Sequence, residues 1–216
     1  MTKVIGIVQV KGGAGRSTLA TNLAGELSKK GKTLLVDCDM PQGTSASWAA
    51  VRQSNPKAKG NLSIETAESH KELVRQMEGS DFDYVILDSP PRIAEMTRAI
   101  LILSDICIVP VGASTAEIWA TTDILKLVDE ASKIRPVDAR MIWTRYRPNT
   151  KLAQELTGLA VTELTIPPMH TRIHMRVAYM EALGEGLTAA ETGDQNAKQE
   201  INSLVNETLA ILRKKK

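Results

Sequence analysis

A glycine-rich segment near the start of the chain constrains the fold more than any other feature. Residues 11–18 read KGGAGRST, directly after the apolar run 4–10 and directly before a helical pattern. A strand, a glycine-rich loop and a helix in that order form an oxyanion site, because the loop leaves backbone N–H groups free and the helix dipole favours negative charge. The candidate phosphate-binding residues are therefore Gly12, Gly13, Ala14, Gly15, Arg16, Ser17 and Thr18.

Two residues predict a Mg²⁺ site beside this loop. Ser17 is placed to offer its hydroxyl to the ion. Asp88 ends the segment YVILD, in which four residues of a buried strand precede an acid, and we expect it to hold Mg²⁺ through water. An acid at a strand end is often only a turn former, but a phosphate loop in the same chain favours the metal role.

Composition places the chain among globular proteins. Its 216 residues suffice for a full core, and we expect one domain over residues 1–216. The hydrophobic share of 43% and the charged share of 24% are ordinary for a folded domain, and no apolar run has the length of a membrane span. Cys38 and Cys107 lie singly in apolar runs, which indicates buried thiols and not a disulfide or metal pair.

Apolar runs alternate with helical patterns almost to the end of the chain. We expect strands at Lys3–Val10, Thr33–Asp37, Tyr84–Asp88, Ile106–Val111, Arg140–Thr144 and Glu163–Ile166. We expect helices at Ser17–Lys30, Lys71–Met77, Ile93–Leu103, Ala116–Ile134, Thr150–Thr157, His174–Leu183 and Ala197–Leu212. This alternation predicts an α/β fold with one doubly wound, mostly parallel sheet and helices on both faces. Ligands of such sheets bind at the carboxyl ends of the strands, where the glycine loop, Asp37, Asp39 and Asp88 all fall.

The glycine loop resembles that of the ParA/MinD family of dimerising P-loop ATPases. Its deviant Walker A motif is Lys-Gly-Gly-x-Gly-(Lys)-Ser/Thr, and residues 11–18 match it except that Arg16 stands at the second lysine. The resemblance implies catalytic roles for Lys11 and Arg16, with Lys11 reaching the partner's nucleotide across an ATP-bound homodimer. Because arginine is a planar fork and not a point charge, we expect nucleotide binding to survive and hydrolysis to be slow.

The segment Asp37–Gly43 is similar to the family's Asp-x-Asp-Pro-Gln-Gly switch, with Met40 inserted. The resemblance gives Asp39 the catalytic role of orienting the attacking water, and it adds Asp39 to the metal site. Catalysis of phosphoryl transfer depends mainly on how the reacting groups are positioned. The insertion of Met40 would displace Asp39, so it also favours slow turnover.

Two later segments resemble the family more loosely. Thr144 and Arg145 end a predicted strand where relatives often carry an Asn-Arg or Thr-Arg pair near the adenine. Pro167 and Pro168 follow the short predicted strand 163–166, where relatives place backbone that brackets the base. Proline after a strand is equally well a simple stop signal.

The resemblance implies a cytoplasmic, nucleoid-associated ATPase that uses ATP and Mg²⁺ and is stimulated by a ParB-like adaptor. The compact chain is most similar to the short, ParF-like partition ATPases, which favours plasmid or chromosome partition on non-specific DNA. Phosphate neutralisation needs only a basic surface. The candidate DNA-binding residues, expected to form one stripe unless acids pair with them, are Arg145, Arg147, Lys151, Arg172, Arg176, Lys214, Lys215 and Lys216.

Three alternatives stay open at the level of sequence. The protein could position a large protein assembly, act as a membrane-bound MinD-like switch, or serve as a nucleotide-dependent scaffold that barely hydrolyses ATP. Membrane binding would use the final helix, whose apolar stripe has a basic end. That stripe has the width of an ordinary core-packing face and lacks aromatic anchors, so core packing is favoured.

Overall fold

A single parallel sheet forms the centre of the computed structural model, which describes residues 2–148 and 151–214. Its seven strands follow the order β3-β2-β4-β1-β5-β6-β7, and every neighbouring pair is parallel. The strands are β1 Lys3–Ile7, β2 Thr33–Asp37, β3 Leu62–Thr66, β4 Tyr84–Asp88, β5 Ile106–Gly112, β6 Ala139–Tyr146 and β7 Pro168–His174. The predicted α/β fold with one parallel, doubly wound sheet is confirmed.

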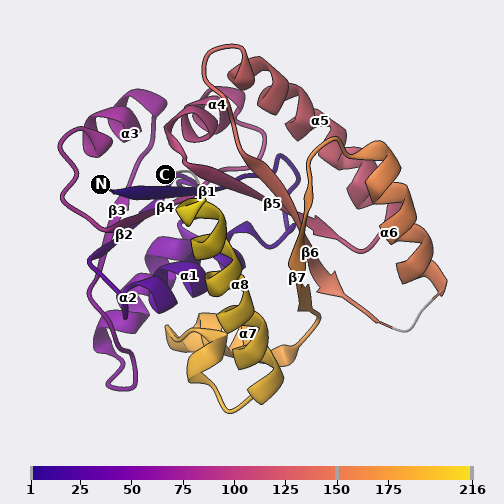
Figure 1. Ribbon diagram of the computed structural model, residues 1–216. Coiled ribbons are helices and arrows are strands. Elements are labelled where there is room, and N and C mark those ends of the chain that lie inside the picture. Colours follow the sequence, from indigo (N-terminus) through magenta and orange to yellow (C-terminus); the bar gives the residue numbers. More distant parts are fainter. Residues whose placement is uncertain (1, 149–150, 215–216) are drawn as a thin grey trace.

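Helices cover both faces of the sheet (Figure 1). One layer contains α3 His70–Met77, α4 Ala94–Leu103, α5 Thr115–Ser132 and α6 Lys151–Glu163. The other contains α1 Arg16–Leu27, α2 Thr44–Ser54, α7 Val177–Glu185, the 3₁₀ turn η1 Ala189–Glu191 and α8 Gln195–Arg213. This double cover explains why β2 and β5 are buried along their whole length and read as continuous apolar runs. No helix in the described ranges has both the length and the apolarity to cross a membrane.

Several predicted boundaries are correct and others are wrong. The strands at 33–37 and 84–88 are confirmed, whereas residues 8–10 belong to the glycine loop and not to the first strand. Both α2 and β3 were absent from the sequence prediction. The predicted strand at 163–166 is wrong, because α6 runs to Glu163 and the strand begins at Pro168. The helix predicted from His174 starts at Val177, and Thr150 lies outside the described residues.

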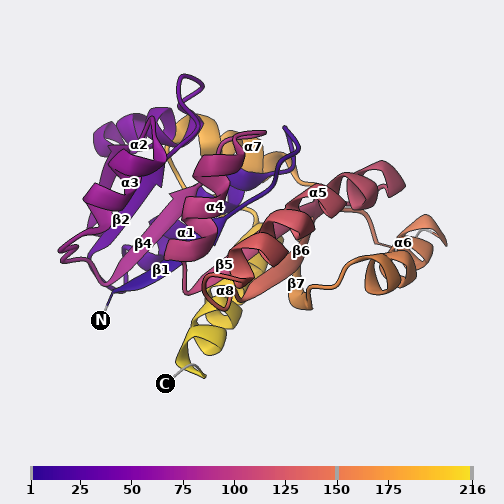
Figure 2. The same ribbon diagram turned by 90° about the horizontal axis from the view of Figure 1, so that it is seen from above.

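Because all strands are parallel, the sheet has two chemically different sides. We call the side where the strands end the carboxyl edge and the side where they begin the amino edge. The loops after β1, β2, β4, β6 and β7 leave from the carboxyl edge, and they bring the glycine loop close to the acids Asp37 and Asp88. The start of β1 and the end of α8 lie at the opposite edge (Figure 2). Residues on the two edges are separated by the length of the strands, so they do not belong to one site.

Candidate functional site

The glycine loop between β1 and α1 has the conformation of an anion-binding loop. Gly13 and Gly15 have φ angles of 72° and 98°, which residues with a Cβ rarely adopt. Helix α1 begins at Arg16, and its N-cap residue Gly15 provides no side-chain cap, so the N–H groups of the first turn remain open to a ligand. The hydroxyl of Thr144 donates to the Ala14 carbonyl over 2.9 Å, which ties the loop to the end of β6.

Arg16 does not point freely into this loop. Its side chain is buried, with 6% of its surface exposed. Nε donates to the Ser89 carbonyl (2.8 Å), and Nη1 donates to the carbonyls of Gln9 (2.8 Å) and Lys11 (2.6 Å). Nη2 lies 3.7 Å from Oδ2 of Asp39. Burial lowers the pKa of the guanidinium, while Asp88 and Asp39 oppose that effect.

Lys11, the front cation of the loop, is half-exposed and meets an acid that sequence analysis missed. Its Nζ lies 3.4 Å from Oε1 of Glu117, in the first turn of α5. The same carboxylate pairs with Arg145 and accepts the Gly112 N–H over 3.1 Å. Glu117 therefore gathers two cations, Lys11 and Arg145, at one side of the glycine loop.

The two acidic segments meet beside the loop. Asp37 and Asp88 are directly opposite in the β2–β4 register, and both are fully buried. Oδ2 of Asp88 accepts from the Ser45 hydroxyl (2.7 Å), and the two carboxylate oxygens of Asp37 accept from the N–H groups of Asp39 and Ala46 (2.9 Å each). Sequence analysis missed Ser45, which is the second residue of α2.

The chemistry of these acids fits a hard cation. Burial raises the pKa of Asp88 to about 7, although a hydrogen bond from Ser45 opposes the rise and Asp37 adds to it. Oδ1 of Asp88 is buried without a hydrogen-bond partner in the described part of the chain. The Ser17 hydroxyl lies near enough to Asp88 to lower the pKa of that carboxyl. Oxygen donors of this kind suit Mg²⁺, whose charge would stabilise the ionised Asp88.

Asp39 lies between Arg16 and the acid Asp37. Its side chain is 15% exposed, and burial raises its pKa while Arg16 lowers it. Its carbonyl accepts the Gly43 N–H over 2.9 Å, which closes the turn that contains Met40. The expected water-orienting role of Asp39 and the effect of Met40 on turnover stay predictions.

A cavity of about 180 Å³ opens on the other side of the glycine loop. Thr18, Thr144 and Arg145 line it, together with the segment that leaves β7. Arg176 of that segment was expected to bind DNA. The other lining residues of the segment were not predicted to take part in a site; they are Ile173, His174, Met175, Tyr179 and Met180. A flat, partly apolar ligand group next to bound phosphates would enter this cavity.

Pro167 and Pro168 are not at this cavity, which corrects their expected contact with the base. Pro168 is the first residue of β7 and pairs with Met141, near the start of β6. The Pro167 carbonyl accepts the Met141 N–H over 3.0 Å. Both prolines therefore lie at the amino edge of the sheet, where proline is tolerated because it opens a strand.

The expected basic stripe is divided between the two edges. Arg145, Arg147, Arg172 and Arg176 lie towards the carboxyl edge, but Lys214 lines a cavity with Pro168 at the amino edge. Arg145 pairs with Glu117, and Arg176 pairs with Glu200 at 2.7 Å. The side chain of Lys151 and residues Lys215 and Lys216 lie outside what the structure describes.

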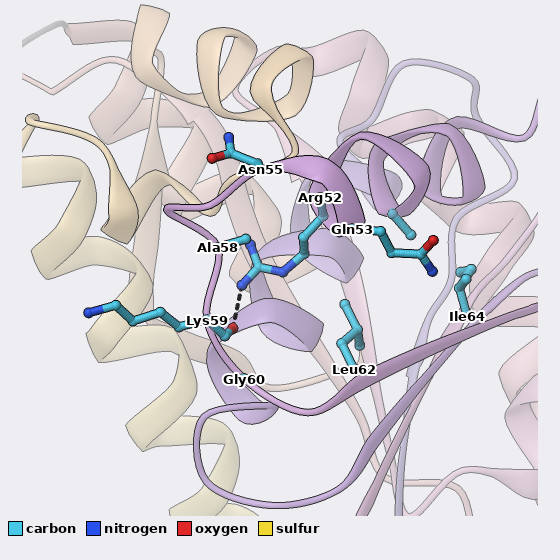
Figure 3. Close-up of a pocket in the computed structure, with 9 residues that line it drawn as sticks. Arg52, Gln53, Asn55, Ala58, Lys59, Gly60, Leu62 and Ile64 are labelled. Carbon is cyan, nitrogen blue, oxygen red and sulfur yellow. Dashed lines mark hydrogen bonds between the residues drawn. The ribbon is translucent and has the colours of Figure 1, made fainter.

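A second cavity, of about 210 Å³, is lined by residues of α2, of the segment 55–60 and of β3 (Figure 3). Its buried arginine, Arg52, donates to the Lys59 and Gly186 carbonyls and to both oxygens of Glu191. Because its guanidinium is already engaged by protein oxygens, Arg52 has a structural role in the wall of this cavity.

A glycine loop between a strand and a helix, with acids at the ends of neighbouring strands, defines a nucleotide-binding protein of the P-loop class. A family model described as an AAA domain matches residues 2–78 and 57–138. The chain belongs to this family and, within it, to the ParA/MinD-like ATPases, which confirms the resemblance seen in its sequence.

Two curated relatives extend over nearly the whole chain. The "maintenance of carboxysome distribution protein A" of Halothiobacillus neapolitanus is 26% identical over 95% of this chain and 95% of its own length. The chromosome-partitioning ATPase Soj of Thermus thermophilus is 28% identical over 87% of each chain.

Solved structures confirm the fold. Apo McdA of Cyanothece has a TM-score of 0.80 at 19% identity, covering 96% of this chain and all of that one. The ATP complex of a McdA variant has a TM-score of 0.77 at 19% identity, covering 96% of each chain.

Proposed function

We propose that this protein is an ATP- and Mg²⁺-dependent switch that distributes a large protein assembly within the cell. The observation that carries this proposal is the 95% mutual coverage with a relative named for carboxysome distribution. The partition ATPase Soj matches over 87% of each chain, so plasmid or chromosome partition is the second candidate. Deleting the gene in its source organism should cluster such an assembly and leave plasmid loss unchanged, and the converse result would restore the partition hypothesis.

The site supports ATP with Mg²⁺ as the ligand. The glycine loop would hold the phosphates, and Ser17, Asp39 and Asp88 would hold the ion, directly or through water. The cavity beside Thr144 would take the base, as a structural neighbour binds ATP in the same fold. Mg²⁺ supplies electrostatic stabilisation of the phosphoryl oxygens.

Dimerisation on ATP gives the switch its on-state. Lys11 contacts Glu117 within its own chain, so reaching a partner's phosphates requires it to leave that acid. In sedimentation with ATP–Mg²⁺, Lys11→Ala should stay monomeric, whereas Lys126→Ala, an exposed lysine of α5, should dimerise normally. A dimer of Lys11→Ala as tight as the parent's would disprove the role of Lys11.

Hydrolysis returns the switch to its off-state when an adaptor stimulates it. Asp39 lies beside Arg16 and near the metal-side acids, where a carboxylate can orient water. Asp39→Ala should therefore accumulate an ATP-bound dimer. Normal turnover in that variant would show that Met40 has moved the segment out of its catalytic register.

Non-specific DNA is the track that we propose for the ATP dimer, which places the protein on the nucleoid. Arg147 and Arg172 lie towards the carboxyl edge, and their described contacts are to Met175 and Tyr146 and not to carboxylates. A titration of random duplex with ATP–Mg²⁺, with ADP and without nucleotide should show salt-sensitive binding with ATP only. Arg147→Ala should weaken it, whereas Lys214→Ala, at the amino edge, should not. Absence of binding in every state would remove DNA as the track.

A further inference from the structure

The guanidinium of Arg16 joins three segments that the proposed switch must move together. Gln9 and Lys11 belong to the glycine loop, and Ser89 follows β4. Asp39, which faces Nη2, follows β2. We propose that Arg16 is a positioning residue that fastens the glycine loop to the segment after β4 through backbone carbonyls and to the segment after β2 through the Asp39 carboxylate. This inference rests on the proposed ATP switch.

The donor inventory of the side chain shows how it is divided. A guanidinium has five N–H donors: one on Nε and two on each terminal nitrogen. The Nε donor and both Nη1 donors are used by the carbonyls of Ser89, Gln9 and Lys11. Nη2 remains, and it faces Asp39 at 3.7 Å. Only the Nη2 edge is therefore left to meet a nucleotide phosphate, and a phosphate there would compete with Asp39 for it.

Lysine cannot reproduce this arrangement. Its three donors sit on a single nitrogen at the end of a flexible stem, so they cannot make the three carbonyl bonds of Arg16 and also face Asp39 or a phosphate. Arg16 instead spreads its charge over a rigid fork that is 94% buried among oxygens. Arginine at this position of the motif thus makes one contact more than a lysine has donors for.

Hydrogen exchange of the nucleotide-free chain, measured by mass spectrometry, tests the proposal without reference to ATP. Arg16→Lys should speed exchange about tenfold in peptides spanning residues 33–45 and 84–95, because both segments lose their anchor. Arg16→Ala should do the same. If lysine preserves the parent's exchange while alanine does not, charge alone is sufficient and the proposal is wrong.

Arg52→Lys is the matched control. Arg52 is equally buried, at 6% exposed, and also donates to backbone carbonyls, but it belongs to α2 and its carbonyl partners are Gly186 and Lys59. Its substitution should accelerate exchange around residues 186–191 and leave residues 84–95 as in the parent. Equal acceleration of residues 84–95 in both variants would show general destabilisation and overturn a local role for Arg16.

Asp39→Asn provides a second test, since it leaves the three carbonyl bonds of Arg16 in place. Exchange should rise in residues 33–45 and stay unchanged in residues 84–95. A rise in both segments would mean that the Asp39 pair, and not the carbonyl bonds, provides the connection. Because all these measurements omit nucleotide, a chain that fails to bind ATP would refute the proposed function and still decide the role of Arg16.

Discussion

Two buried arginines, Arg16 and Arg52, have different polar surroundings. Both are 6% exposed, and both donate to backbone carbonyls. Around Arg52 the acid is fully engaged, because Glu191 also binds Lys29 (3.0 Å) and accepts the Thr188 N–H (2.9 Å). Around Arg16 the nearest acid stands 3.7 Å away.

The polar groups near Arg16 are also incompletely satisfied. Oδ1 of Asp88 and Oγ of Ser89 are buried without hydrogen-bond partners within the described residues. A satisfied network stabilises the fold, whereas unsatisfied buried oxygens cost free energy until a ligand meets them. The Arg52 cluster is therefore suited to maintaining the structure, whereas the open oxygens of the Arg16 cluster suit a cation.

Removing Arg52 should give the largest change in stability. Arg52→Ala leaves the Glu191 carboxylate buried without its main partner, which costs about 3–5 kcal/mol of unfolding free energy. Urea unfolding of the nucleotide-free protein measures this loss. Gln53→Ala, at an exposed neighbour on α2, should change stability by less than about 0.5 kcal/mol. A loss below about 1 kcal/mol in Arg52→Ala would show that the Arg52 cluster does not stabilise the fold in the way that its contacts predict.

Acid should weaken the Arg52 cluster in a defined pH range. Glu191 is desolvated, but hydrogen bonds from Arg52, Thr188 and Lys29 prevail and lower its pKa from 4.5 to about 2. A depressed carboxyl pKa stabilises the fold above the unfolded value and loses that contribution as pH falls through the folded value. About 3 kcal/mol should therefore disappear between pH 4.5 and pH 2.

The comparison with Glu191→Gln isolates this effect from other carboxyls. The stability difference between parent and variant should shrink steadily over that pH range in urea unfolding. A constant difference would show that the ionised form of Glu191 is not what stabilises the fold.

Asp88→Asn should separate function from stability at the other cluster. Losing the charge that would meet Mg²⁺ should lower turnover by about 100-fold. The nucleotide-free protein should be no less stable, because a neutral amide avoids the desolvation that raises the pKa of Asp88. Steady-state ATPase assays and urea unfolding test both parts, with the exposed Asp123→Asn as control. Lower stability with unchanged turnover would assign Asp88 to the fold.

The sequence predicted the interior of the sheet better than its margins. Strands β2 and β4 were predicted to the residue because helices cover both faces and force continuous apolar runs. The edge strand β3, LSIET, is only partly buried and alternates in polarity, so it gave no such run. Helix α2 was missed because Trp48 and Ala49 supply nearly all of its buried apolar surface.

No strand was predicted over β7, and its last residue, His174, was placed at the start of a predicted helix. Met169, Thr171 and Ile173 are buried on one face, and polar residues separate them. Such a short period-2 pattern is hard to distinguish from the start of a helix when a proline pair precedes it. The proline pair was interpreted either as backbone that brackets the base or as a stop signal, although Pro168 opens the strand.

The part of the site that directly follows buried strands was predictable from the sequence. The glycine loop and the acids Asp37, Asp39 and Asp88 are local in sequence and adjoin buried strands. Ser45 and Glu117 reach the site only through tertiary packing, from helices with ordinary sequences. The side-chain bonds of Arg16 were likewise invisible, because a motif gives a position and not the direction of a guanidinium.

Thr144→Val should give the smallest effect and tests how the glycine loop is held. Valine keeps the shape of threonine but cannot donate to the Ala14 carbonyl, so stability should fall by about 1 kcal/mol. Thr122→Val, at an exposed threonine of α5, is the matched control. Nucleotide affinity should fall only a few-fold, since the carbonyl bonds of Arg16 still connect the loop to Ser89. A much larger loss of affinity would mean that β6, and not Arg16, fixes the loop, which would make the two arginine clusters more alike than their contacts indicate.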